Sequence, residues 1–280
     1  MSNDEERIAE FRKKIFLTAY AASIAHLASA YSIVEILYTL YFKGILNYDP
    51  ANPKMEKRDR LILSKGHASL AIYSVLCMAG FFDEETLGTF CNPGSILGGE
   101  PCMPNIPGIE ASTGSLGHGL SIGVGMALAL KTDNKVGRVY VILGDGECQE
   151  GSVWEAVMSA VSFKLDNLIV ILDNNRLQKM GYVRDIMGID SWKTRWEAFG
   201  WSVDEVDGHN IDDLQQHLAT EGVKDKPRII IANTVKGKGI SIMENEPGWH
   251  FKLPNRRELK IIMRELIISE EELTKCKRHI

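Results

Sequence analysis

Short apolar runs recur along the chain, separated by stretches in which apolar positions have helical spacing. Residues 138–143, 167–172 and 228–233 are rich in β-branched side chains and predict buried strands. Residues 59–64 predict a shorter strand, and residues 201–206 a further one. Continuous apolar strands that alternate with helices are typical of a parallel sheet covered on both faces. The pattern therefore predicts an α/β fold with a doubly wound, mostly parallel sheet.

Helical periodicity is longest at the start of the chain, over residues 4–42, with an interruption near residues 26–31. The remaining predicted helices cover residues 67–80, 119–130, 153–161 and 212–219. Residues 119–130 are small and apolar, which suits close packing against a sheet or another subunit.

Two segments differ from this alternating pattern. Residues 90–119 are rich in Gly, Pro and small polar residues, and a loop of this length within a compact chain is more often functional than idle. Residues 255–280 are helical in pattern and heavily charged, so we expect a peripheral helix there.

Composition narrows the class of protein. A hydrophobic content of 45% and a charged content of 25% are ordinary for a soluble globular protein. The net charge of −5 gives no electrostatic reason to expect a nucleic-acid partner or an anionic membrane. The charged amino terminus, the lack of a membrane-spanning apolar run and five scattered cysteines without a C-x-x-C pair predict a cytoplasmic protein with reduced thiols.

The candidate chemistry lies at the ends of two consecutive predicted strands. Gly144-Asp145-Gly146 ends one, and Asn174-Asn175 ends the next. Each motif by itself is a common turn or strand terminator. If the strands are neighbours, however, the Asp145 carboxylate and the Asn175 amide oxygen converge on one point, where hard oxygen ligands suit Mg²⁺ or Ca²⁺. The flanking glycines allow close approach of the backbone to a diphosphate, and the following helix directs its N-terminus towards that anion.

A Gly-Asp-Gly followed about thirty residues later by Asn-Asn resembles the metal–diphosphate motif of thiamine diphosphate enzymes. Four stretches narrow the resemblance to the amino-terminal third of transketolases. They are LSKGHASLAIYSVL (63–76), STGSLGHGLSIGVGMALA (112–129), GDGECQEGSVWEA (144–156) and VKGKGISIMENEPGWH (235–250). The chain resembles the amino-terminal subunit of a split transketolase, with residues 1–254 as the diphosphate- and metal-binding domain and 255–280 as its peripheral tail.

The resemblance implies an enzyme that transfers a two-carbon ketol unit from a ketose donor, such as a ketose phosphate, to an aldose acceptor with thiamine diphosphate and Mg²⁺ or Ca²⁺. The glutamate that activates the cofactor, the pyrimidine-binding domain and the carboxy-terminal domain would then belong to a partner subunit. We expect an α₂β₂ assembly, and we expect this chain alone to hold half of an active site.

The resemblance also assigns roles to individual residues. It implies metal ligation by Asp145, Asn175 and the carbonyl of Leu177. The residues that it places at the cofactor are His67, Gly114, Leu116, Gly144, Asp145, Gly146, Glu147, Asn175, Lys179 and His250. The catalytic residues that it implies are His26, His67, His250 and Glu150, of which Glu150 resembles the acid that links cofactor sites across the dimer interface of the family.

Three positions depart from the pattern of the family. Glu100 stands where a substrate-facing histidine is usual, Lys179 stands where an apolar residue packs by the thiazolium, and Phe251 replaces a glycine. His26, Glu100 and His250 are the candidate substrate contacts. A lysine buried near the cofactor needs a charged partner, and Glu100 is the candidate partner of Lys179. These departures leave open a specialised transketolase that acts on a branched, deoxy or sulfonated ketose.

Other classes share parts of this pattern. A 2-oxo acid dehydrogenase α-subunit has the metal motif but lacks SKGHA and STGSLG at these positions. Deoxyxylulose phosphate synthase shares the fold, but its chain is continuous and its motifs diverge from MENEPGWH. A non-catalytic regulatory partner is a further alternative, against which the intact metal and diphosphate residues argue.

Overall fold

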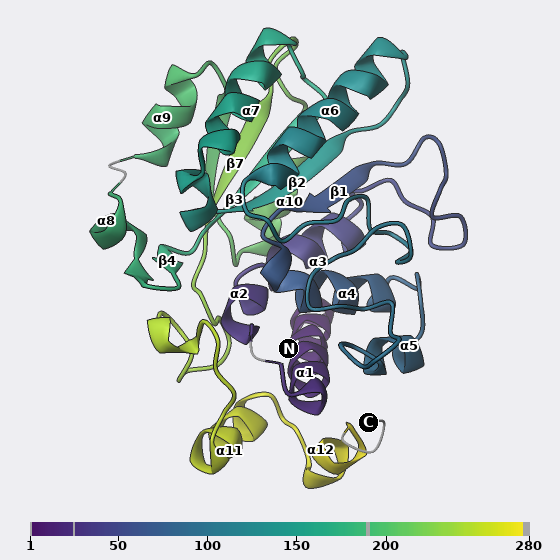
Figure 1. Ribbon diagram of the computed structural model, residues 1–280, viewed down its shortest axis with the longest axis vertical. Coiled ribbons are helices and arrows are strands. Elements are labelled where there is room, and N and C mark those ends of the chain that lie inside the picture. The colour runs from purple at the N-terminus through teal and green to yellow at the C-terminus, as the bar shows by residue number, and fades with distance from the viewer. Residues whose placement is uncertain (1, 25, 189–190, 277–280) are drawn as a thin grey trace.

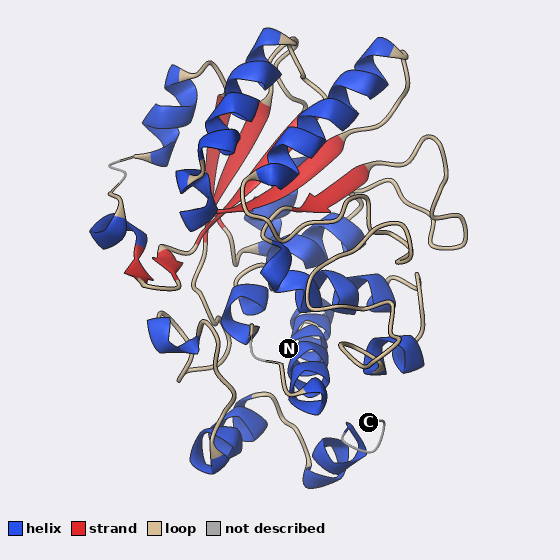
Figure 2. Ribbon diagram, in the orientation of Figure 1, coloured by secondary structure: helices blue, strands red, loops and turns tan. Residues whose placement is uncertain are grey.

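The computed structural model describes residues 2–24, 26–188 and 191–276. At its centre is a sheet of five parallel strands with helices on both faces (Figures 1 and 2). In order across the sheet, the strands are β1 (Arg60–Leu63), β2 (Val139–Gly144), β3 (Leu168–Asn174), β7 (Arg228–Asn233) and β6 (Ser202–Asp207). The predicted fold class is confirmed, including the further strand expected near residues 201–206.

Strand β2 shows why both faces of the sheet are covered. All of its residues are buried, and they alternate between two apolar cores. Val139, Val141 and Leu143 pack into one core, whereas Tyr140 and Ile142 pack into the other. A strand without a polar face must have helices on both sides.

One face of the sheet is covered by α6 (His118–Thr132), α7 (Gly151–Ser162) and α9 (Trp192–Ala198) (Figure 1). Helix α6 lies close to the sheet because Gly123 has no side chain, and a Cβ there would lie 2.6 Å from Cγ2 of Val141. The small residues of α6 thus pack against the sheet, as their pattern suggested.

The other face is covered by helices from the first third of the chain and by one later helix. They are α1 (Asn3–Ala22), α2 (Leu27–Tyr31), α3 (Val34–Phe42), α4 (Ser69–Met78) and α10 (Ile211–Ala219). The side chain of Ser2 caps the start of α1 in a capping box with Glu5. The expected interruption near residues 26–31 is slightly misplaced, because α2 is itself helical and the breaks fall before and after it.

The long loop and the tail differ in how well their sequences predicted them. After α5 (Glu84–Gly88), residues 89–117 form neither helix nor strand, as expected. The tail forms two helices instead of one, α11 (Arg256–Glu265) and α12 (Glu270–Cys276). Lys13 on α1 holds this tail through the Ile267 carbonyl and an ion pair with Glu272. The domain boundary at residue 254 stays a prediction.

Several small elements at the strand ends have no periodicity that could predict them. The strands β4 (Leu177–Gln178) and β5 (Gly181–Tyr182) form a short hairpin after β3 and are followed by α8 (Val183–Ile186). The 3₁₀ turns are η1 (Gly66–Ala68), η2 (Gly146–Gln149) and η3 (Pro247–Trp249). Within the described residues, no helix is long and apolar enough to cross a membrane.

Candidate functional site

The candidate site lies where the carboxyl ends of β2, β3 and β7 meet. These strands are neighbours, with Gly144 paired to Asp173 and Asn174 paired to Asn233. The residues that follow them surround a cavity of about 170 Å³, as expected for ligand sites of open parallel sheets. Its lining includes His67, Asp145, Asn175, Leu177, Lys236 and His250. The structure therefore brings together the two strand-end motifs that the sequence singled out.

Asp145 is a buried carboxylate at the edge of this cavity, with only 2% of its surface exposed. Its Oδ1 accepts a hydrogen bond of 2.7 Å from the Gly146 amide, and Oδ2 accepts one from the Arg176 amide. Burial, followed by the charge of Asp173, raises the pKa of Asp145 to about 7. A carboxylate whose ionised form is this unfavourable is suited to a bound cation, which would stabilise the negative charge.

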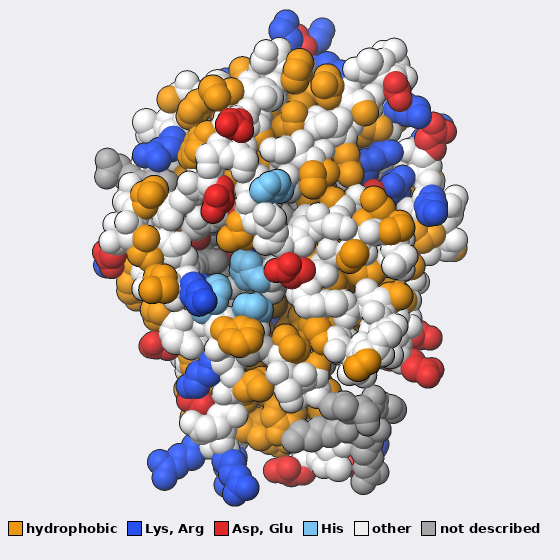
Figure 3. Space-filling view, in the orientation of Figure 1, with side chains coloured by type: hydrophobic (Ala, Val, Ile, Leu, Met, Phe, Trp, Pro, Cys, Tyr) orange, Lys and Arg blue, Asp and Glu red, His pale blue; other side chains and the backbone are white. Residues whose placement is uncertain are grey.

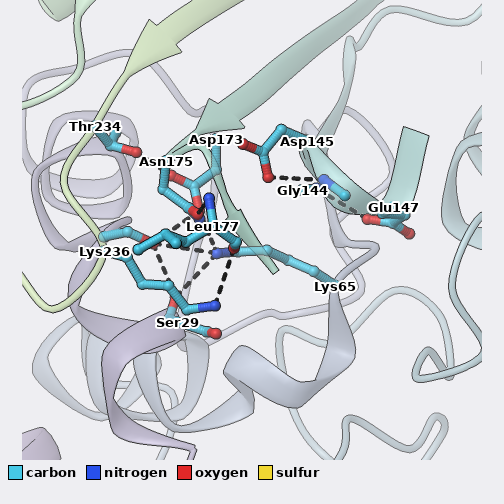
Figure 4. Close-up of polar contacts among 12 residues, drawn as sticks. Ser29, Lys65, Gly144, Asp145, Glu147, Asp173, Asn175, Leu177, Thr234 and Lys236 are labelled. Atoms are coloured by element: carbon cyan, nitrogen blue, oxygen red, sulfur yellow. Dashed lines mark hydrogen bonds and ion pairs between the residues drawn. The ribbon is translucent and has the colours of Figure 1, made fainter. Parts of the chain in front are cut away.

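Asp173 fixes the orientation of the Asn175 amide. Asn175 Nδ2 donates to Asp173 Oδ2 at 2.7 Å, so the amide oxygen points to the opposite side, where it accepts from the Leu177 amide at 3.0 Å (Figure 4). Asp173 is fully buried and also accepts from Ser32, Lys65 and Thr234. Burial alone would raise the pKa of Asp173, but the charge and hydrogen bond of Lys65 more than offset it, and the pKa lies below its ordinary value.

Two buried lysines enter the cavity from opposite sides (Figure 4). Lys65 Nζ pairs with Asp173 and donates to the Ser29 carbonyl at 2.9 Å. Lys236 Nζ donates to the Leu177 carbonyl and lies 3.0 Å from His250 Nδ1. Burial and the charge of Lys65 lower the pKa of Lys236 to about 8. Two ammonium groups at one cavity create a site for an anion.

Three histidines gather beside the lysines. The ring centroids of His26, His67 and His250 lie 5.6–5.7 Å from one another. Figure 3 shows histidine side chains grouped in a hollow of this face, with a basic side chain on one side and an acidic one on the other. Burial, then nearby lysine charges, lower the pKa of each ring, that of His250 to about 4. All three rings are therefore neutral near pH 7 and can each accept a proton.

Glu147 connects the loop before α6 to the strand ends. One carboxylate oxygen accepts from the Gly117 amide at 2.9 Å and from Ser64, and the other accepts from the Gly144 amide at 3.0 Å. Leu116, the residue before Gly117, thereby lies at the cavity. Both carboxylate oxygens of Glu147 have protein partners, so the contacts of Glu147 hold the walls of the cavity together.

The outer candidates are exposed, and two of them, Glu100 and Lys179, are called the rim of the site. Glu150 lines the cavity at the start of α7 and is exposed. Glu100 is also exposed, and its carboxylate lies against Gly114, where a Cβ would be 1.9 Å from Oε2. Lys179 is exposed rather than buried, and no ion pair joins it to Glu100 in the part of the chain that the structure describes. The expected mutual neutralisation of Glu100 and Lys179 is therefore wrong for this chain on its own.

Several polar residues of the cavity were missed in the sequence. They are Ser29, Lys65, Gln149 and Lys236 in its lining, and Asp173 and Thr234 buried behind it. Lys65 and Lys236 lie in the stretches SKGHA and VKGKG, which resemble the transketolase family. This resemblance was the sequence feature that could have indicated the two lysines. Gln149 lines the cavity, and its Nε2 is buried without a hydrogen-bond partner. A buried donor of this kind is satisfied when an acceptor occupies the cavity.

The polar groups fit a metal that is shared with a ligand better than a metal held by protein alone. Across the described residues, no three His, Cys, Asp or Glu side chains are grouped so that they could hold a metal ion. Asp145, the Asn175 amide oxygen and the Leu177 carbonyl supply three oxygens and one charge. A hard cation here needs further oxygen ligands, and the adjacent lysines favour an anionic molecule that carries them.

Comparisons with known proteins agree with this geometry. The family described as "Transketolase, thiamine diphosphate binding domain" matches residues 12–266. The chain is 42% identical over 265 residues to an apulose-4-phosphate transketolase subunit of Phocaeicola vulgatus, covering 94% of each chain. It is 42% identical over 228 residues to "6-deoxy-6-sulfo-D-fructose transketolase subunit SqwG" of a Clostridium species, covering 81% of this chain and 82% of that one.

A solved transketolase from Pichia stipitis in complex with sedoheptulose-7-phosphate superposes with a TM-score of 0.88 at 27% identity. This alignment covers the whole of the present chain but 44% of the solved one. The fold, the site and the sequence thus define a member of the transketolase family. More particularly, the chain matches the thiamine diphosphate-binding domain of that family, and relatives of similar length are named as transketolase subunits. The family and function predicted from the sequence are confirmed, whereas the roles of single residues stay predictions.

Proposed function

We propose that this chain and its partner subunit transfer a two-carbon ketol unit from a ketose to an aldose, with thiamine diphosphate and Mg²⁺ or Ca²⁺ bound at the strand-end cavity. One observation carries the proposal: oriented oxygen ligands, two buried lysines and neutral histidines surround a single cavity. When bound, the cofactor would supply a thiazolium ring whose C2, once deprotonated, is the nucleophile for the ketose carbonyl and whose positive charge stabilises the negative charge left on the two-carbon unit.

The metal would be held by Asp145, Asn175 and the Leu177 carbonyl, with Asp173 keeping the Asn175 oxygen directed at it. Lys236 now donates to the Leu177 carbonyl, so a cation at that oxygen would release the ammonium to an adjacent phosphate. The diphosphate would contact the Gly146 amide, His67 and His250, and both buried lysines and Gln149 Nε2 are placed to add to these contacts.

The remaining candidates form the walls and the entrance of the site. Gly114 and Leu116 would lie against the rings of the cofactor, and Gly144 and Glu147 would support the strand end beneath the diphosphate. Gly66 allows the loop at Gly114 to approach, because a Cβ on Gly66 would lie 2.7 Å from the Gly114 nitrogen. Lys179 lies near enough to His26 and His250 for its charge to lower their pKa values.

Proton movement on the substrate is assigned to neutral histidines. His26 and His250 would each accept or donate a proton at a sugar hydroxyl, since both are uncharged near pH 7. Lys236 donates towards His250 Nδ1, which places the proton of that ring on Nε2. Glu150 would link the two cofactor sites across the subunit interface.

A modified ketose is the favoured donor. Two relatives carry names that contain apulose-4-phosphate and 6-deoxy-6-sulfo-D-fructose, and this chain has the acidic side chain of Glu100 beside Gly114. A carboxylate accepts hydrogen bonds from sugar hydroxyls and repels a phosphate or sulfonate. The donor would therefore present hydroxyl groups, and not its charged end, to Glu100.

The partner would be a subunit with the pyrimidine-binding and carboxy-terminal domains, joined to this chain in an α₂β₂ assembly in the cytoplasm. The activating glutamate of the cofactor would come from that partner. Support comes from the relatives that are named as single subunits of a transketolase.

Mixing the two purified subunits tests this proposal. This chain alone should show no ketol transfer, and activity should appear when the partner is added and saturate at a one-to-one ratio of subunits. Substantial transfer by this chain alone would contradict the proposal, as would an inactive complex that binds thiamine diphosphate and Mg²⁺ but turns over no ketose.

A further inference from the structure

Lys236 belongs to residues 234–240, a segment after β7 that forms neither helix nor strand. Its side chain lines the cavity. The backbone of this segment is held from outside the cavity. Gly237 N donates to the Ala28 carbonyl at 3.0 Å, and Arg12 Nε donates to the Lys238 carbonyl at 2.9 Å. The amide of Val235, next to Lys236, has a side chain as its acceptor, His209 Nε2 at 2.8 Å.

The contacts of His209 define its tautomer. A backbone amide can only donate, so Nε2 must be unprotonated to accept from Val235. Nδ1 then carries the proton and donates to Glu35 Oε2 at 3.0 Å. The imidazole therefore joins helix α3, which carries Glu35, to the segment that carries Lys236. His209 does not line the cavity itself.

Glu35 is a buried carboxylate that accepts hydrogen bonds from both His209 and Arg12. Its side chain is 7% exposed, and its other oxygen accepts from Arg12 Nη2 at 2.6 Å. Burial by itself would raise the pKa of Glu35, but the His209 hydrogen bond and the Arg12 charge outweigh it, and the pKa lies below its ordinary value. Glu35 is therefore an ionised acceptor for the proton on Nδ1, which leaves Nε2 free for Val235.

We propose that His209 is a positioning residue for Lys236. Glu35 fixes the Nδ1-protonated tautomer of His209, Nε2 fixes the Val235 amide, and this bond directs the Lys236 side chain to the Leu177 carbonyl and the diphosphate. This inference rests on the proposed binding of thiamine diphosphate, but the link from His209 to Val235 is testable without it.

Two substitutions separate this role from general support of the fold. In His209→Gln, the amide oxygen stands near the position of Nε2 and can still accept from Val235. In His209→Asn, the shorter amide can still donate to Glu35 but does not reach Val235. His217→Asn, on α10, is the matched control, because His217 Nδ1 contacts only its own helix.

Hydrogen exchange of the full chain measures the Val235 amide directly. His209→Asn should speed exchange of this amide about tenfold, the upper value for a net hydrogen bond, whereas His209→Gln and His217→Asn should stay within about twofold of the parent. In the complex with the partner, His209→Asn should weaken thiamine diphosphate binding by about the same factor, and His209→Gln should not. Equal exchange and equal affinity in both His209 variants would overturn the proposal.

Nitrogen NMR of the histidines in the parent chain gives a result that does not depend on variant folding. The proposal predicts that His209 is protonated on Nδ1 and unprotonated on Nε2, and a proton on Nε2 would overturn it. If the parent complex fails to bind thiamine diphosphate, the proposed function fails, while the exchange and NMR results still decide whether His209 holds Val235.

Discussion

The interior of the cavity and its rim are built in opposite ways. Inside, Asp173 is fully buried and accepts hydrogen bonds from Ser32, Lys65, Asn175 and Thr234. At the rim, Glu100 and Lys179 are exposed and form no ion pair with each other. The hydrogen bonds of Asp173 are all made within this chain, whereas the rim has exposed polar groups that a substrate or a partner subunit can contact.

The difference assigns different tasks to the two regions. A buried network with each member bonded is rigid and keeps ligand atoms in place before the ligand arrives. An exposed charge has little effect on stability but can change which molecule binds. Interior substitutions should therefore affect folding and cofactor affinity, and rim substitutions should affect the choice of donor.

Removing the carboxylate at the centre of the interior should have the largest effect. Asp173→Ala leaves Lys65 buried without a counter-ion, which should lower the free energy of unfolding by about 3–5 kcal/mol. Asp166→Ala removes one partner of Lys131 at the surface, where the pair is about one-third exposed, and should cost less than about 1 kcal/mol. Urea unfolding of the isolated chain measures both. Similar losses in the two variants would show that the buried ion pair of Asp173 contributes no more stability than a surface pair.

A charge that faces the cavity should affect binding more than stability. Lys236→Met removes the proposed charge-assisted contact with the diphosphate, which should weaken thiamine diphosphate binding by the complex about tenfold to a hundredfold. Lys238→Met is the matched control, because the Lys238 side chain is 39% exposed and pairs loosely with Glu244 at 3.8 Å. Calorimetry at fixed Mg²⁺ measures both affinities, and unchanged affinity in Lys236→Met would exclude Lys236 from the diphosphate site.

The rim should give the smallest effect, limited to specificity. Glu100→His with Lys179→Ile should raise kcat/KM for a common ketose phosphate relative to the native donor by about tenfold, the value of one hydrogen bond at a desolvated site. Cofactor affinity should stay within about twofold of the parent, because neither side chain belongs to the buried network. The same donor ranking in the double variant and the parent would show that these positions do not select the ketose.

The sequence predicted those features that follow from neighbouring elements. Asp145 and Asn175 end consecutive parallel strands, and a strand–helix–strand unit places such ends side by side. The continuous apolar runs predicted buried strands, and buried strands require helices on both faces of the sheet. The rim residues were found only because the chain resembles a family and departs from it.

The missed features depend on contacts between distant segments. Lys65 and Lys236 meet at one cavity although 171 residues separate them, and no local pattern shows that both are buried there. The orientation of the Asn175 amide depends on its hydrogen bond to Asp173, which two-residue spacing alone does not define. The exposure of Lys179 follows from the hairpin of β4 and β5, which is too short to have a hydrophobic period.

Calorimetric titration of thiamine diphosphate into the complex with its partner, with and without Mg²⁺, tests the central claim most directly. In the parent, Mg²⁺ should strengthen binding at least tenfold, since the metal is proposed to join the diphosphate to Asp145 and Asn175. Asp145→Ala should remove this Mg²⁺ dependence while the complex stays folded, and Asp133→Ala, an exposed aspartate after α6, should retain it. Metal-dependent binding of parental strength in Asp145→Ala would contradict the account.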